Sequence, residues 1–144
     1  MRKIIVLMIA ASLVTGFTGC KKAIQAAEEK KVVNAITSGV WIVTKFTQAG
    51  TDVTADFSGW EFTYYDNGTC VANKTGNTAI SGTWGYNIVN TTTVYFTAAF
   101  TGTAPAPLPK LASTWLIVDV ASDSKASYSR TEAGVDYKLE LSKK

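Results

Sequence analysis

From Gly39 onward, apolar and polar residues alternate in short stretches that turn-forming residues separate. A period of two places alternate side chains on opposite faces of a β-strand. In the clearest stretch, Trp60, Phe62 and Tyr64 share one face, and Asn67-Gly68 follows with the backbone freedom that a tight hairpin needs. The pattern predicts an all-β domain in which this aromatic face is buried.

Eight such stretches follow one another along the chain. Short turns join most of them, so consecutive strands are expected to pair as antiparallel hairpins. A meander of eight strands can close into an up-and-down barrel without free edges, and we predict this fold, with an open β-sandwich as the alternative. The predicted strands are residues 40–46, 60–65, 69–72, 80–88, 94–96, 111–120, 125–130 and 135–141.

The longest predicted connection is residues 97–110, which contain all three prolines of the chain. Alternating prolines cannot join a β ladder, because proline lacks the N–H group that the ladder needs. We therefore predict a loop. A passive crossover is favoured over a lid that folds across the mouth of the barrel.

The beginning of the chain has the pattern of an export signal: Arg2 and Lys3, then an apolar run from Ile4 to Val14, then small residues before Cys20. That run is too short to cross a bilayer as a permanent helix. The sequence Thr18-Gly19-Cys20 resembles a lipobox, in which diacylglycerol alkylates the cysteine thiol. We predict a bacterial lipoprotein with a signal peptide over residues 1–19 and fatty-acyl chains, such as palmitate, on Cys20.

The segment between Cys20 and the first strand, residues 20–38, is rich in Ala, Glu and Lys. Its apolar residues have loosely helical spacing, and Gly39 follows as a helix stop. We predict a lipid-anchored helical tether that covers one end of a domain over residues 39–144, with a flexible tether as the alternative. Lys21 is not the aspartate that retains Gram-negative lipoproteins in the inner membrane, which favours the outer membrane of the cell envelope.

Charge and residue content exclude several function classes. Removal of residues 1–19 leaves twelve basic residues against eleven acidic ones, so a nucleic-acid partner is not expected. The chain has no histidine, and Cys70 is the only thiol besides Cys20, so zinc sites, catalytic triads and disulfides are not predicted. Asp52, Thr54, Asp56 and Ser58 alternate, and a solvated edge strand is favoured there over a calcium site. No cofactor or metal is predicted, and no enzyme activity.

Several motifs resemble the lipocalin-like domains of bacterial cell-envelope lipoproteins. Gly39-Val40-Trp41 is similar to the Gly-x-Trp signature of lipocalins, and Asp66-Asn67-Gly68-Thr69, Gly82-Thr83-Trp84 and a strand with Trp115 follow in a similar layout. The resemblance implies an eight-stranded barrel with Trp41 at its closed end. Lipocalins pack an arginine of the last strand over this tryptophan, whereas the last strand predicted here holds only Lys138, and Arg130 lies one strand earlier.

The aromatic residues of the strands are the best candidates for a function. Large rings with polar tips fill protein cores, and they also line apolar pockets that need a few hydrogen bonds. Our first hypothesis is a barrel that binds a small hydrophobic or amphipathic ligand without catalysis. The alternative is an accessory or scaffolding domain with a filled barrel that contacts another envelope protein. The candidate ligand-binding residues are Trp60, Phe62, Tyr64, Trp84, Tyr86, Trp115 and Tyr137.

Overall fold

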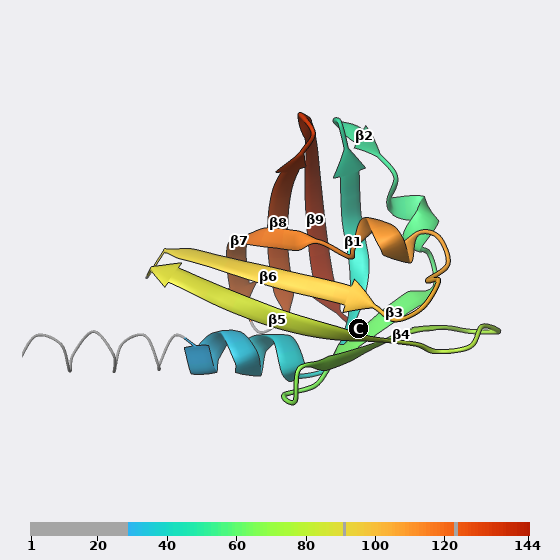
Figure 1. Ribbon diagram of the computed structural model, residues 1–144, viewed down its shortest axis with the longest axis horizontal. Coiled ribbons are helices and arrows are strands. Elements are labelled where there is room, and N and C mark those ends of the chain that lie inside the picture. Colours follow the sequence, from blue (N-terminus) through green and yellow to red (C-terminus); the bar gives the residue numbers. More distant parts are fainter. Residues whose placement is uncertain (1–28, 91, 123) are drawn as a thin grey trace, which may run out of the picture.

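The computed structural model describes residues 29–90, 92–122 and 124–144 (Figure 1). The predicted signal peptide and Cys20 lie outside the described residues. The described part begins with a helix over residues 29–37, and strands follow almost to the end of the chain. The elements after the helix are β1 (Val40–Gln48), β2 (Thr51–Asp52), the 3₁₀ helix η1 (Thr54–Phe57), β3 (Trp60–Tyr64), β4 (Thr69–Lys74), β5 (Ile80–Asn90), β6 (Thr93–Phe100), the 3₁₀ helix η2 (Leu108–Lys110), β7 (Thr114–Ser122), β8 (Lys125–Glu132) and β9 (Val135–Lys143).

The strands close into an antiparallel barrel. From β3 to β9 each strand pairs with the next, and β1 pairs with both β3 and β9, so eight strands complete the ring. The two-residue strand β2 pairs only with β1 and stands outside this ring. The predicted up-and-down barrel is confirmed, and the pairing of β1 with β9 rules out an open sandwich.

The ladder that joins β1 to the barrel is long on one side of the strand and short on the other. The β1–β9 pairing runs from Trp41 opposite Lys143 to Gln48 opposite Tyr137. The β1–β3 pairing contains only two residue pairs, Val40 with Thr63 and Trp41 with Phe62. Beyond these pairs η1 follows β2 and packs beside β1, where the backbone N–H of Phe46 donates to the Thr54 hydroxyl at 2.8 Å.

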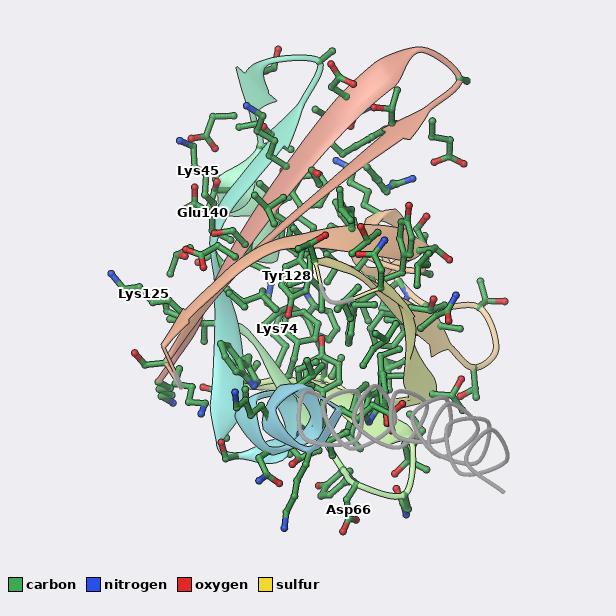
Figure 2. All side chains as sticks on the ribbon, turned by 90° about the vertical axis from the view of Figure 1, so that its left-hand side faces the viewer. Lys45, Asp66, Lys74, Lys125, Tyr128 and Glu140 are labelled. Carbon is green, nitrogen blue, oxygen red and sulfur yellow. The ribbon has the colours of Figure 1, made fainter. Side chains whose placement is uncertain are left out.

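The alternation of the strands places aromatic and aliphatic side chains inside the barrel. On β3 the face predicted to be buried is buried, with Trp60, Phe62 and Tyr64 all almost inaccessible to solvent. Figure 2 shows Tyr128 of β8 among the side chains that the strands surround, whereas Lys45, Lys125 and Glu140 point away from the wall. One continuous apolar core therefore fills the space between the strands among the described residues.

The N-terminal helix covers one end of this core. Its residues Ala35 and Ile36 are buried, and Val32 and Val33 pack against the core. The indole N–H of Trp41 donates to the carbonyl oxygen of Ile36 at 2.8 Å, which fixes the end of the helix to the first strand. The short N-terminal helix of the predicted fold is thus confirmed over residues 29–37. No helix among the described residues is long and apolar enough to span a membrane.

Two predicted element boundaries are wrong. The strand predicted over residues 94–96 runs over Thr93–Phe100, because residues 97–100 continue the ladder with β5, from Gly85 opposite Thr97 to Gly82 opposite Phe100. The following loop therefore covers residues 101–113 instead of 97–110, and β7 begins at Thr114. The continuation of β6 was not predicted because residues 97–99 are polar or small, although Ala98 is buried in the expected alternation.

The predicted edge strand over residues 52–58 is also wrong. The β-structure ends at Asp52, and Thr54–Phe57 form η1. The Asp52 carboxylate accepts hydrogen bonds from the backbone N–H of Thr54 at 2.9 Å and from its hydroxyl at 2.6 Å, which turns the chain out of the strand. These two hydrogen bonds hold the pKa of Asp52 below its usual value. Among the described residues no group of three or more His, Cys, Asp or Glu is placed to hold a metal ion.

Candidate functional site

Three of the seven candidate rings lie in one cluster. The ring centroids of Tyr64 and Trp84 are 6.0 Å apart, and Phe96 lies 5.5 Å from Tyr64 and 6.1 Å from Trp84. Tyr128 follows at 5.4 Å from Phe96. Tyr86, whose ring lies 6.2 Å from that of Trp84, is the third candidate and the exposed end member of the cluster. The indole N–H of Trp84 donates to the carbonyl oxygen of Tyr65 at 2.7 Å, so it is not free for a ligand.

Two further candidates, Trp115 and Tyr137, belong to a second cluster around Phe46. The Phe46 ring lies 6.0 Å from Trp115, 6.4 Å from Tyr137 and 4.9 Å from Phe57 of η1. Trp115 is completely buried, and its indole N–H donates to the carbonyl oxygen of Leu111 at 3.1 Å. Tyr137 keeps partial access to solvent. Trp115 is thus a core residue in this structure, and Tyr137 lies at its margin.

The last two candidates pack with other partners. The Phe62 ring lies 6.4 Å from Phe100, and Trp60 carries the ammonium group of Lys74 at 5.8 Å from its ring centroid. The seven candidate residues therefore do not line one site. Five of them, Trp60, Phe62, Tyr64, Trp84 and Trp115, are buried in the core of the described barrel.

A charged side chain that the sequence did not single out as a ligand group lies at the second cluster. The guanidinium carbon of Arg130 is 4.0 Å from the ring centroid of Tyr137 and 4.7 Å from that of Trp115. Its side chain is only 9% exposed. Large positively charged side chains are rarely buried to this extent, and the two aromatic faces offset part of the lost hydration.

The hydrogen bonds of Arg130 are incomplete. Nη2 donates to the carbonyl oxygen of Lys110 at 3.2 Å, and Nη1 donates to the Glu132 carboxylate. The buried Nε–H has no hydrogen-bond partner. Glu132 lies two residues further along the strand, and its side chain is 65% exposed. One N–H of a buried guanidinium is therefore unpaired, and the only carboxylate on it comes from a solvated side chain.

The position of Arg130 follows from the alternation of β8. Ala126 and Tyr128 are buried on the inner face, and Arg130 is the next residue on that face. The predicted strand over residues 125–130 contained this signal, because a period of two that starts at Ala126 places position 130 inside. The sequence comparison considered Arg130 only as a departure from the lipocalin pattern, and the face of the strand on which it lies was not used.

A segment from each of two distant loops covers the barrel beside Arg130. Leu108 of η2, the following Leu111, and Phe57 of η1 are all buried in the core. The Lys110 ammonium group of η2 pairs with the Asp56 carboxylate of η1 at 2.9 Å. Figure 1 shows the two short helices side by side to the right of β1, η1 in green and η2 in orange. The proline-containing loop thus packs into the barrel and is more than a passive crossover.

A cleft of about 300 Å³ lies on the wall next to Arg130. The last β7–β8 pair towards this end is Leu116 opposite Ser129, so Trp115 and Arg130 are neighbours beyond the paired part of the two strands. Hydroxyl groups dominate the lining. They belong to side chains such as Ser129 and Thr131, which alternate with the inward-facing Arg130, so the cleft lies on the outer face of the wall. The cleft is lined by Tyr95, Thr114, Leu116, Ser129, Arg130 and Thr131.

Three polar side-chain tips lie inside the other cluster. Burial, together with the neighbouring Tyr128 and Cys70, holds the pKa of Tyr64 well above its ordinary value. Burial also raises the pKa of Tyr128. It raises the pKa of the Cys70 thiol to about 11, so this group is a neutral thiol at physiological pH. These groups are polar tips in an apolar interior, and Cys70 is a free, buried cysteine.

One departure from the lipocalin pattern is smaller than the sequence indicated. Because β9 extends to Lys143, two residues beyond the predicted end, the last strand places a second lysine opposite Trp41. The Lys143 ammonium group lies 5.1 Å from the centroid of the Trp41 ring. A cation of the last strand therefore does cover the first-strand tryptophan, although it is lysine in place of arginine.

Comparison with known proteins supports the fold. The chain resembles the crystal structure of a DUF4847 family protein from Bacteroides vulgatus ATCC 8482, with a TM-score of 0.53 over 77% of this chain and 96% of the other. The sequence identity is 16%, so the likeness concerns the fold alone. A search of protein families and a search of curated proteins both give no match.

Proposed function

We propose that this protein is a lipid-anchored cell-envelope protein that binds a small amphipathic molecule with an acidic head group, without catalysis. The observation that supports the ligand is the buried, incompletely paired guanidinium of Arg130 between Trp115 and Tyr137. A buried charge is costly unless strong hydrogen bonds compensate for it. A carboxylate or a phosphate ester would supply such bonds, and arginine binds either in a bidentate manner.

Glu132 is a partner of Arg130 that an anionic ligand could replace at a small cost in free energy. Its carboxylate forms an ion pair with the guanidinium while the side chain remains largely in solvent. An anionic ligand would take the place of Glu132, which would return to water and keep its hydration. The apolar part of the ligand would then contact Tyr137 and the cover formed by η1 and η2, whose buried side chains continue the aromatic cluster.

The anchor and the location rest on the first twenty-one residues. The basic start, the short apolar run and Cys20 favour lipid attachment at Cys20, and Lys21 favours the outer membrane. Mass spectrometry of the protein released gently from its own envelope tests this part. A mature chain that begins with an acylated Cys20 is the expected result, and an unmodified cysteine would contradict the anchor.

The ligand is tested with two probes of equal chain length, laurate and dodecanol. Laurate is expected to change the fluorescence of the tryptophans, because it would alter the surroundings of Trp115. Arg130→Met should weaken the binding of laurate about 10- to 100-fold, which corresponds to the loss of a charged hydrogen bond, and should leave dodecanol unaffected. Lys74→Met is the matched control, because it also removes a cation from a tryptophan ring, but at Trp60. Equal binding of laurate by the wild type and Arg130→Met would overturn the role of Arg130.

A second candidate function is an accessory domain with a filled barrel that contacts another envelope protein. The observation in its favour is the continuous packing of the rings, with Phe46 and Trp115 completely buried. If neither probe changes the fluorescence, and the protein released from the envelope carries no small molecule, this second function is the better description.

A further inference from the structure

Large apolar side chains are exposed together where the β5–β6 hairpin lies next to β7. Val89 near the end of β5 is 60% exposed, and Val118 of β7 is 62% exposed. Tyr86 of β5 is also exposed. Most other large apolar side chains of the described barrel are buried or half-buried, so these residues stand out as an apolar surface that water covers only at a cost.

The register brings the two valines close to each other. Asn90, the neighbour of Val89, pairs with Thr93 at the start of β6. On the other side of β6, Tyr95 pairs with Leu116 of β7, so Val118, two residues further along, lies beside the start of β6. The register shifts between Ile88 and Asn90, which leaves Val89 without a paired residue on β6.

The N-terminal helix begins at this same end of the molecule. In Figure 1 the tip of the β5–β6 hairpin and the first described turn of the helix both lie at the left, whereas the loop between β4 and β5 lies at the far right. Figure 2 looks directly onto the left-hand end, with the helix below the strands. The helix also carries the exposed lysines Lys30 and Lys31 in this first turn.

The length of chain before the helix limits how far this end can be from an anchor at Cys20. Glu29 is nine positions after Cys20, and a fully extended segment of nine residues spans about 30 Å. We propose that the end of the barrel formed by Val89, Val118 and the start of the helix rests on the membrane surface at the depth of the lipid head groups. This inference relies on the lipid anchor of the proposed function.

The chemistry of this end fits a bilayer surface. Tyrosine side chains favour the boundary between head groups and acyl chains, exposed valines lose contact with water there, and lysines nearby are attracted to anionic lipids. Asp119, next to Val118, is exposed and would resist deeper entry. The contact is therefore shallow, and it orients the barrel by adding a second point of attachment to the covalent one.

Site-specific fluorescent labelling of the full acylated protein tests the orientation. Val89→Cys and, separately, Val118→Cys would be labelled with an environment-sensitive dye such as NBD and reconstituted in vesicles of equal parts phosphatidylglycerol and phosphatidylethanolamine. Cys70 is buried as a neutral thiol and would not react, which confines the label to the new cysteine. Thr78→Cys, in the exposed loop between β4 and β5, is the matched control at the opposite end.

The expected result is a shift of NBD emission to shorter wavelength, with quenching by lipids spin-labelled near the head group, at positions 89 and 118 but not at 78. An unchanged emission at both valine positions, or equal shifts at all three, would overturn the inference. The mass of the same sample separates the two proposals: acylated protein without the shift refutes the orientation and leaves the anchor intact. An unacylated chain refutes the anchor instead.

Discussion

Replacing Gly82 with alanine tests how closely β5 approaches its neighbours inside the barrel. A Cβ atom at this position would lie 2.3 Å from the backbone oxygen of Ala99, 3.0 Å from the sulfur of Cys70 and 3.1 Å from a ring carbon of Phe100. The contact with Ala99 is the decisive one, because a backbone oxygen of the paired strand cannot rotate away. Relief requires that β5 and β6 move apart by nearly 1 Å, at the position where Gly82 pairs with Phe100.

Such overpacking typically costs 1–3 kcal/mol, and we expect about 3 kcal/mol or more here because backbone must move. In urea, with a slope of about 1–3 kcal/mol per molar for a domain of this size, the midpoint of unfolding should fall by at least about 1 M. Urea titration followed by tryptophan fluorescence measures this shift, and an unchanged slope would show that the loss lies in the folded state.

Gly85→Ala is the matched control on the same strand. A Cβ at Gly85 meets nothing within 4 Å, so this variant should match the wild type or gain up to about 1 kcal/mol from the lower entropy of the unfolded chain. The reasoning fails if Gly82→Ala unfolds within about 0.5 kcal/mol of Gly85→Ala, the usual scatter of harmless substitutions. In that event β5 and β6 would not have the register described.

Three further predictions concern single interactions, all measured by urea unfolding. Trp41→Phe replaces the indole by a smaller aromatic ring and leaves the buried carbonyl of Ile36 without its donor, and should cost at least about 1–3 kcal/mol. A neutral result would mean that the helix does not depend on this bond. Above pH 9 the Cys70 thiol ionises in the unfolded chain, whereas in the folded protein it stays neutral until its pKa of about 11. This difference should lower the free energy of unfolding by about 2–3 kcal/mol across that range, and Cys70→Ala should reduce the fall. Arg130→Met should be as stable as the wild type or more stable, because it removes a buried charge and leaves Glu132 in solvent; a large loss would show that the arginine serves the fold.

The sequence predicted the barrel because period and turn chemistry agree along most of the chain. The alternation of β3 and β9 is unbroken, and the Asn67-Gly68 turn is where the hairpin forms. The closing β1–β9 pair joins the two ends of the domain, and no local pattern encodes such a contact. It followed only from the number of strands, so a sandwich stayed open as an alternative until the pairing was known.

The candidate site was less predictable, because it depends on which rings meet. Alternation placed the rings of β3 and Trp84 inside, but it could not indicate that Trp115 would contact Phe46 from a strand far away in the sequence. Arg130 was missed for a different reason. Its burial depends on two aromatic faces and on a backbone carbonyl of η2, and these come from three separate elements.

Three cations lie over tryptophan rings in the described barrel. They differ in how deeply their charge is buried. Lys74 over Trp60 and Lys143 over Trp41 are half-buried residues, and the Lys143 ammonium group also donates to the Ser38 hydroxyl at 2.7 Å. Arg130 instead has its guanidinium enclosed, with an N–H unpaired. Packing alone explains a cation whose charge stays hydrated. It does not explain one whose charge is buried without full compensation, and an anionic ligand would provide the missing partner.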